Sequence, residues 1–175
     1  MEHILVSPAG RLALYFGRGL IPILISLATV SVGLTYADLF FGVTIPVAAI
    51  PALAVSVVLT AFAMVGFGLL LGGVALYLRT SIILGNIFLF IGLLLSGVNF
   101  PLSALPLPLR LIGDGLPLTW GLAAIRAAIS GESLSSLAVL WAAVALAAAV
   151  SFGAAISLWQ VFERRALSTG SIARF

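Results

Sequence analysis

Long apolar runs, each ended by charged residues or by proline, dominate the pattern of hydrophobic and polar positions along the chain. Four runs reach or approach the roughly 20 apolar residues that a helix needs to cross the hydrocarbon core of a bilayer. They are Gly19–Tyr36, Ile45–Leu78, Ser81–Val98 and Leu134–Phe162. The pattern therefore predicts an all-α, polytopic membrane protein with four transmembrane helices.

Two of these runs are longer than one span requires. The second contains Pro46 and Pro51 near its start, and the residue before a proline is driven away from helical geometry. We therefore expect its first turn to be irregular. The fourth ends at Glu163, and its length indicates a tilt or an extension beyond the bilayer.

The stretch from Asn99 to Arg126 is too apolar for a solvated loop and too interrupted for a span. Proline cannot continue a helix without losing a hydrogen bond, and backbone at membrane depth must find its partners within the protein. Both conditions predict a re-entrant helical hairpin between the third and fourth spans. The prolines that interrupt the stretch are Pro101, Pro106, Pro108 and Pro117.

The first arm of this hairpin is expected from Ser103, as its cap, to Gly113. The turn is expected at Gly113-Asp114-Gly115. The second arm is expected from about Pro117 or Leu118 to Ile129, with Pro117 suited to a first helical position and Gly131 ending the arm.

Residues 1–18 show a different pattern. Ser7 and Pro8 are suited to the cap and the first position of a new helix. Apolar residues share one face of it, namely Leu5, Leu12, Ala13 and Phe16. The sequence predicts an amphipathic helix that lies at the membrane interface and leads into the first span.

Composition agrees with a membrane protein of one domain, residues 1–175. Of the 175 residues, 63% are hydrophobic and 7% are charged, whereas a soluble domain carries roughly 25% charged residues. The mean hydropathy is +1.33. With the N-terminus inside, six of the eight basic residues lie on the cytoplasmic side, as the positive-inside rule requires. Both termini are then cytoplasmic and the hairpin lies on the outer side.

Several kinds of chemistry are excluded. The chain has no cysteine and one histidine, so disulfide, thiolate and ordinary metal chemistry lack their residues. No Gly-x-x-x-x-Gly-Lys-Ser/Thr loop is present and every basic residue is arginine, so the chain has no phosphate-binding loop for a nucleotide. The arginines are scattered among apolar segments, which argues against nucleic-acid binding. We expect no catalytic, metal or cofactor site.

Two stretches resemble the membrane subunit of ABC-2 type ABC transporters, the export permeases. "ILVSPAGRLALYFGRGLI" at Ile4–Ile21 is similar to the cytoplasmic coupling segment of that family. Leu93–Gly131 is similar to its outer hairpin. The matching positions there are Ser96, Gly97, Phe100, Pro101, Leu105, Pro106, Leu116, Pro117, Leu118, Thr119, Arg126 and Gly131.

The resemblance implies a bacterial cytoplasmic membrane protein that pairs with a second permease chain and with a separate ATPase subunit. It places ATPase docking on the coupling segment, at Glu2, Ser7, Pro8, Arg11 and Leu12. The alternative for this segment is an amphipathic anchor lying on lipid. The family normally has six spans, two of them before the coupling segment, so the chain resembles the C-terminal four-helix portion.

Three residues within the predicted spans are candidates for helix packing. Gly68 and Gly72 have the spacing that lets another helix approach closely, although glycine is common in membrane helices. Asn86 needs a hydrogen-bond partner in an apolar medium, and we favour another helix over a substrate. For Arg126 we favour a structural role in positioning the hairpin, through lipid head groups, Asp114 or Glu132.

The sequence thus favours the permease subunit of an ATP-driven exporter for a hydrophobic drug-like or lipid-linked substrate. The alternative is a truncated structural or regulatory subunit that assembles with a full-length permease without transporting. An intramembrane enzyme is disfavoured because ionisable groups are essentially missing from the predicted spans.

Overall fold

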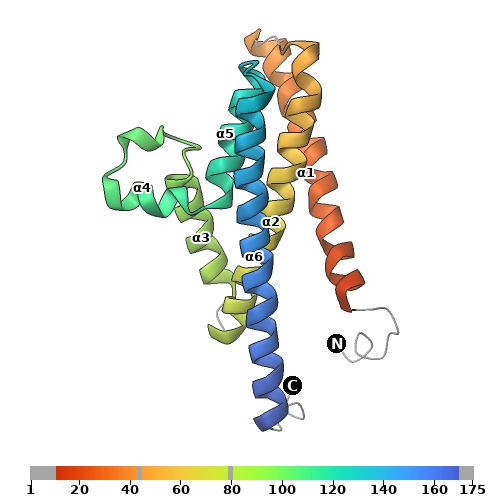
Figure 1. Cartoon of the computed structure of the whole chain (residues 1–175), viewed down its shortest axis with the longest axis vertical. Helices are drawn as coiled ribbons and strands as arrows, with labels where there is room; N and C mark the ends of the chain where they lie inside the picture. Colours follow the sequence, from red (N-terminus) through yellow and green to blue (C-terminus); the bar gives the residue numbers. More distant parts are fainter. Residues whose placement is uncertain (1–10, 43–44, 79–80, 170–175) are drawn as a thin grey trace. The chain divides into compact units, whose positions relative to one another are not determined.

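The structure is a computed structural model that describes residues 11–42, 45–78 and 81–169. Every regular element within these ranges is a helix (Figure 1). The elements are α1 (Arg11–Phe41), the 3-10 helix η2 (Val47–Ala49), α2 (Ile50–Leu78), α3 (Ser81–Leu95), the 3-10 helix η3 (Leu102–Ala104), α4 (Leu107–Asp114), α5 (Pro117–Ile129) and α6 (Leu134–Thr169). The chain divides into two compact units, residues 1–45 and 46–175.

In the first unit, α1 contains an apolar span, Ile23–Phe41, in which no residue is buried. The hydroxyl groups of Thr29, Ser31 and Thr35 donate to carbonyls one turn earlier along the same helix. Thr29 donates to Ile25, and Ser31 donates to Leu27, each at 2.8 Å. Because these hydroxyls have partners in their own helix, they can face lipid without being left as unpaired donors.

Among the described residues, the end of the predicted amphipathic segment and the first span belong to one continuous helix. α1 runs without interruption from Arg11 to Phe41, across the expected boundary at Arg18. Gly17, Gly19 and Pro22 lie near this boundary, and the helix continues through them although glycine and proline are the weakest helix formers. The predicted start at Ser7 and Pro8 lies outside the described residues.

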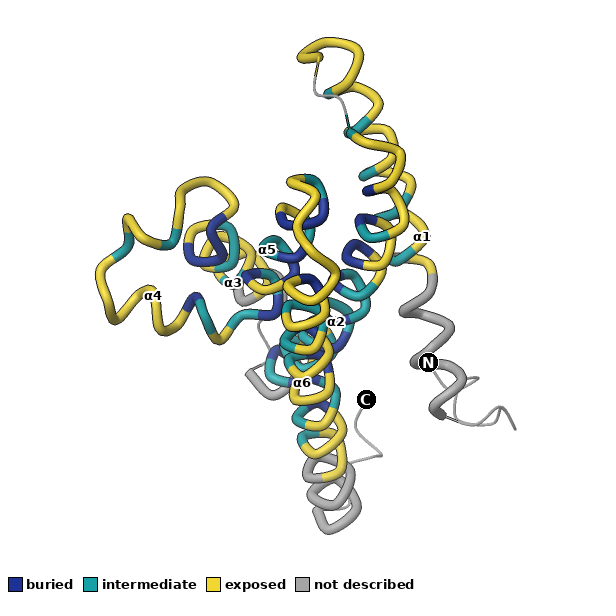
Figure 2. Tube along the Cα trace, turned by 45° about the horizontal axis from the view of Figure 1, so that its top comes forward, coloured by how far each residue is buried: buried dark blue, intermediate teal, exposed yellow. Residues whose placement is uncertain are grey.

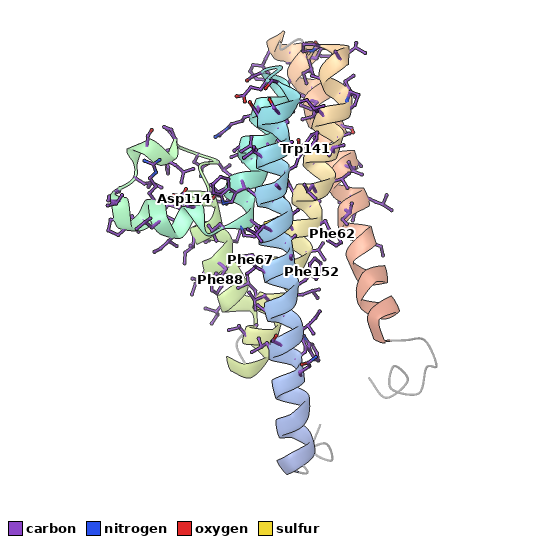
Figure 3. The ribbon with its side chains drawn as sticks, in the orientation of Figure 1. Phe62, Phe67, Phe88, Asp114, Trp141 and Phe152 are labelled. Atoms are coloured by element: carbon purple, nitrogen blue, oxygen red, sulfur yellow. The ribbon has the colours of Figure 1, made fainter. Side chains whose placement is uncertain are left out.

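In the second unit, α2 packs most extensively against α6 and then against α5, and α5 also packs against α6. Figure 2 shows the buried positions where these three helices face one another. The core contains Ala63 of α2 with Val144 and Ala148 of α6. The rings of Phe62 and Phe152 pack with centroids 4.9 Å apart between α2 and α6 (Figure 3).

Glycines let the three helices approach closely. A Cβ atom built on Gly66 would lie 2.7 Å from the Phe152 ring, and one on Gly73 would lie 2.9 Å from Leu158. A Cβ on Gly121 of α5 would collide with the side chain of Thr60 on α2, whose own Cβ would be 2.9 Å away. The small residues thus set the distances from α2 to its two neighbours.

The irregular start predicted for the second span is confirmed. Pro46 adopts φ −57° and ψ 132° and precedes η2, after which α2 begins at Ile50. Together these residues provide a span-length apolar stretch, Val47–Ala75, and α6 provides another, Leu134–Gln160.

The third predicted span is shorter than expected. α3 has 15 residues, roughly 22 Å at the rise of an α-helix, against a hydrocarbon core of about 30 Å. It ends at Leu95 rather than Val98, because Gly97 adopts a left-handed φ of +79°. Three helices of the described residues, rather than four, are long and apolar enough to cross a bilayer.

The fourth predicted span lies within a longer helix, in agreement with the extension that its length indicated, and its apolar stretch is Leu134–Gln160. α6 continues through Glu163, Arg164 and Arg165 to Thr169. Glutamate and arginine are good helix formers, so a charged cluster marks a change of solvent without ending the helix.

The contact of Gly121 with Thr60 gives a stability prediction. We expect Gly121→Ala to destabilise the protein by about 1–3 kcal/mol, because the new methyl group overpacks the α2–α5 interface. Gly68→Ala is the matched control, since Gly68 has open space around it, and it should be neutral or stabilising. Unfolding by SDS in mixed micelles, followed by tryptophan fluorescence, measures both. Equal stability of the two variants would contradict this packing.

Candidate functional site

The segment predicted as the hairpin folds into two helices, but they do not form antiparallel arms. α4 begins at Leu107 with Pro106 at its cap, and Ser103 lies in η3 without a capping bond. Gly115 caps the end of α4, and α5 starts with Pro117 at its first position. Figure 1 shows α4 running across the direction of α5 rather than back along it.

The end of α5 matches the prediction. Gly131 adopts a φ of +69°. Its N–H bonds the Ala128 carbonyl at 3.2 Å, and the N–H of Glu132 bonds the Ala127 carbonyl at 3.0 Å. This is the Schellman arrangement, which glycine enters without steric strain.

The ends of α3 and α4 meet at a junction that only glycine permits. A Cβ atom on Gly113 would collide with the backbone oxygen of Leu95 and lie 3.1 Å from the Leu102 side chain. Backbone atoms cannot move aside as the end of a flexible side chain can. Gly113 therefore fixes the last turn of α4 against the last turn of α3.

Three side chains of α5 donate to carbonyls at this junction. Arg126 Nη2 donates to the Gly97 carbonyl at 2.8 Å, Thr119 Oγ1 to Gly113 at 2.5 Å, and Trp120 Nε1 to Asp114 at 2.7 Å. Carbonyls at helix ends lack partners within the helix, so Arg126 and Trp120 satisfy groups that lipid cannot. The Gly113 carbonyl also accepts from the Leu116 N–H at 3.0 Å, so Thr119 is an additional donor to it. We call Thr119, Trp120 and Arg126 the α5 donors.

Arg126 therefore has a structural partner that sequence reasoning did not name. It donates to the Gly97 carbonyl, rather than to Asp114 or Glu132. No sequence signal specifies a backbone acceptor 29 residues away. This contact agrees with the structural role that we expected for Arg126 in positioning the segment predicted as the hairpin.

A second polar cluster joins α2, α5 and α6. Trp141 Nε1 of α6 donates to Ser56 Oγ of α2 at 2.8 Å. Ser56 Oγ lies 2.8 Å from the Ala52 carbonyl and 3.5 Å from the Ala124 carbonyl of α5. Ser56 is buried, so one hydroxyl connects three helices in a medium without water.

The three predicted packing residues do not make these contacts. A Cβ atom on Gly68 or Gly72 would meet nothing within 4 Å, and Asn86 is exposed. The close approaches on α2 use Gly66 and Gly73 instead. These two glycines are seven residues apart, and this spacing, which places them on one helix face, is the signal that could have identified them.

Of the predicted docking residues, only two fall among the described residues. Arg11 and Leu12 form the first turn of α1. Glu2, Ser7 and Pro8 lie outside the described ranges. In those ranges no group of three or more histidine, cysteine, aspartate or glutamate side chains could hold a metal ion.

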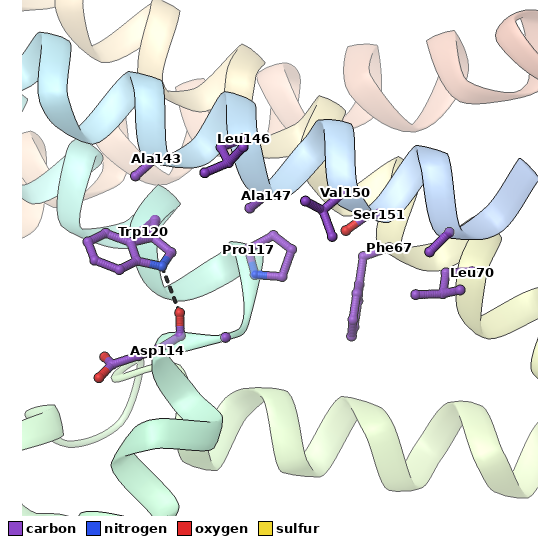
Figure 4. A pocket seen from close by; sticks show the side chains of 12 residues that line it. Phe67, Leu70, Asp114, Pro117, Trp120, Ala143, Leu146, Ala147, Val150 and Ser151 are labelled. Atoms are coloured by element: carbon purple, nitrogen blue, oxygen red, sulfur yellow. Dashed lines mark hydrogen bonds between the residues drawn. The ribbon is translucent and has the colours of Figure 1, made fainter. Parts of the chain in front are cut away.

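An open groove of about 390 Å³ lies beside the start of α5 (Figure 4). Its base is one stripe of α6: Ala143, Leu146, Ala147, Val150, Ser151 and Ala154. Phe67 and Leu70 of α2 line one end, and Asp114 and Trp120 line the other. We call this the α6 groove; its volume lies in the range of small-molecule sites.

The bond from Arg126 to Gly97 gives a test of the junction. Ser96 is buried and its hydroxyl has no partner among the described residues, so Ser96→Cys should be tolerated and react slowly with maleimide. Adding Arg126→Gln should speed this reaction at least several-fold, because it removes a charge-assisted hydrogen bond of about 1.5–3 kcal/mol.

The control places the cysteine at the exposed Ser103, where labelling should be fast with or without Arg126. The chain has no native cysteine to interfere. An unchanged rate at position 96 in the Arg126→Gln background would show that Arg126 does not hold the junction.

Comparison with known proteins gives one family. Residues 1–130 match the model of the ABC-2 type transporter membrane domain. No curated protein and no solved structure gives a significant match. The matched region contains α1, α2, α3 and the junction with its three α5 donors. Because the match covers well over half of the chain, this protein belongs to the ABC-2 type transporter family, as a membrane permease component that is not itself catalytic.

Proposed function

We propose that the chain is the permease subunit of an ATP-driven ABC-2 type exporter. The observation that carries the proposal is the family match over residues 1–130. Three helices of the described residues are also long and apolar enough to cross a membrane. The cargo is a hydrophobic drug-like or lipid-linked molecule, moved outward across the bacterial cytoplasmic membrane.

ATP is bound by a partner in this proposal. The sequence has neither a Gly-x-x-x-x-Gly-Lys-Ser/Thr loop nor any lysine, and such a loop is what holds the phosphates in ATPases of this kind. A separate ATPase subunit supplies hydrolysis and docks on Glu2, Ser7, Pro8, Arg11 and Leu12. A second permease chain, identical or related, completes the pathway.

The proposed topology has both termini in the cytoplasm and the segment 101–131 on the outer side. The arginine distribution supports this orientation. α4 carries exposed apolar side chains, among them Leu107, Leu111 and Ile112, together with the exposed Arg110. Such a helix is suited to lie along the outer interface, while α5 enters the membrane between α2 and α6.

The arrangement suggests how hydrolysis is passed on. Movement of the ATPase subunits displaces the N-terminal segment and with it α1. Outside, α5 is fixed to α2 and α6 and holds the ends of α3 and α4 through the α5 donors. A shift of α2 or α6 is therefore transmitted to α4, which covers the outer exit.

Copurification tests the partner directly. With a C-terminal tag and mild detergent, we expect an ATPase subunit to copurify with the native chain. The double variant Arg11→Glu/Arg18→Glu should lose it, because charge reversal disrupts docking at the coupling segment. Mass spectrometry identifies the copurified proteins.

The matched control is Arg164→Glu/Arg165→Glu, which makes the same charge change near the same face of the membrane and should keep the ATPase. Failure of the native chain to retain any ATPase, or equal loss in both variants, would contradict docking at this segment. Recovery of a permease without an ATPase would favour a non-transporting role.

Cysteine labelling tests the topology. Ser103→Cys should react with an impermeant maleimide added to intact cells, because segment 101–131 lies outside. Ser168→Cys should react only after the membrane is permeabilised. Labelling of position 103 only after permeabilisation would reverse the proposed orientation.

A further inference from the structure

The two ends of the α6 groove differ in chemistry. Phe67 and Leu70 provide a wholly apolar end. At the other end the indole of Trp120 and the carboxylate of Asp114 lie on the same side of the α4–α5 turn (Figure 4). Between them the α6 stripe from Ala143 to Ala154 is roughly 16 Å long at the rise of a helix. A molecule with one polar and one apolar end would match this order.

The carboxylate of Asp114 is free to bind a ligand. It makes no hydrogen bond or ion pair within the ranges that the structure describes; only the backbone carbonyl of Asp114 is used, by Trp120. The side chain is half-buried. Arg110 precedes it by one turn on α4 but does not line the groove, and no ion pair joins the two among the described residues.

A carboxylate beside an indole selects for positive charge. The carboxylate attracts a cation, more strongly where lipid and protein exclude water. The face of a tryptophan ring attracts the same cation through its quadrupole. An anionic ligand would be repelled by Asp114, and a neutral one would gain nothing from it.

We propose that the α6 groove binds lipophilic organic cations, with the charge at Asp114 and Trp120 and the apolar body along α6 toward Phe67. The proposal identifies a class of cargo and therefore rests on the proposed permease function. Binding itself requires neither ATP nor a partner, and it is tested on the purified chain alone. Loss of ATPase copurification and loss of cation binding are therefore separate results.

The test uses radiolabelled tetraphenylphosphonium and the chain in nanodiscs of phosphatidylcholine and phosphatidylglycerol, with empty nanodiscs subtracted. We expect saturable binding that unlabelled tetraphenylphosphonium displaces. Radiolabelled tetraphenylborate, the anion of the same shape, is tested in separate samples and should show no saturable binding beyond that of empty nanodiscs. Absence of saturable cation binding, or equal saturable binding of the anion, would overturn the proposal.

Variants assign the site. Asp114→Asn keeps the side-chain shape and should weaken binding roughly tenfold, equivalent to about 1.4 kcal/mol. Asp114→Glu should keep most of it. Glu132→Gln is the matched control, because it removes the same charge from an exposed position that does not line the groove, and it should leave binding unchanged.

Two further measurements test whether the α6 groove itself is the binding site and whether a lipid head group competes for it. Ala147→Phe fills the base of the groove and should reduce binding even with Asp114 present; size-exclusion profiles verify that each variant is folded. Adding phosphatidylethanolamine, whose head group carries an ammonium, should compete weakly. Complete displacement by this lipid, or equal binding by Asp114→Asn and the native chain, would show that the groove is not a site for lipophilic cations.

Discussion

The contact between α5 and α2 determines much of the rest of this structure. In lipid the hydrophobic effect does not drive helices together, so close packing and interhelical hydrogen bonds must do so. Gly121 provides the packing by bringing the α5 backbone onto Thr60. Ser56 provides the hydrogen bonding, since its hydroxyl receives the Trp141 indole N–H and lies near the Ala124 carbonyl.

Because α5 is held against α2 and α6, it can position the ends of α3 and α4. Thr119, Trp120 and Arg126 project from α5 to the ends of α3 and α4, where they donate to three carbonyls. The same turn places Asp114 beside the indole and forms one end of the α6 groove. Helix packing, the outer junction and the groove are thus connected through one helix of 13 residues.

The sequence predicted the elements that depend on local chemistry. Proline at position 117 and glycine at position 131 correctly bounded α5, because both act through their own backbone angles. The early end of α3 at Leu95 was missed. A run of apolar residues shows which part of the chain lies in an apolar medium. It does not show at which residue the backbone leaves helical geometry.

The candidate site could be predicted only in part. Thr119 and Arg126 were identified through family resemblance and Gly113 through the glycines of the predicted turn, and the structure gives each a contact at the junction. Their partners are backbone carbonyls, which carry no sequence signal. Helix packing was assigned to Gly68 and Gly72, which face open space within this chain, so the approach of another helix to them stays a prediction. The close approaches of α2 to α6 use Gly66 and Gly73, because a glycine motif does not say which face of α2 meets α6.

Disulfide trapping in native membranes tests the packing of α5 on α2 most directly. Ser56→Cys with Ala124→Cys places two thiols across this contact, and Val58→Cys with Ala124→Cys moves one of them to an exposed face of α2. After oxidation and denaturation, the first pair should bind no maleimide-linked polymer, and the second should bind two. Equal tagging of both pairs, with no cross-linked dimer on a non-reducing gel, would contradict the packing of α5 against α2.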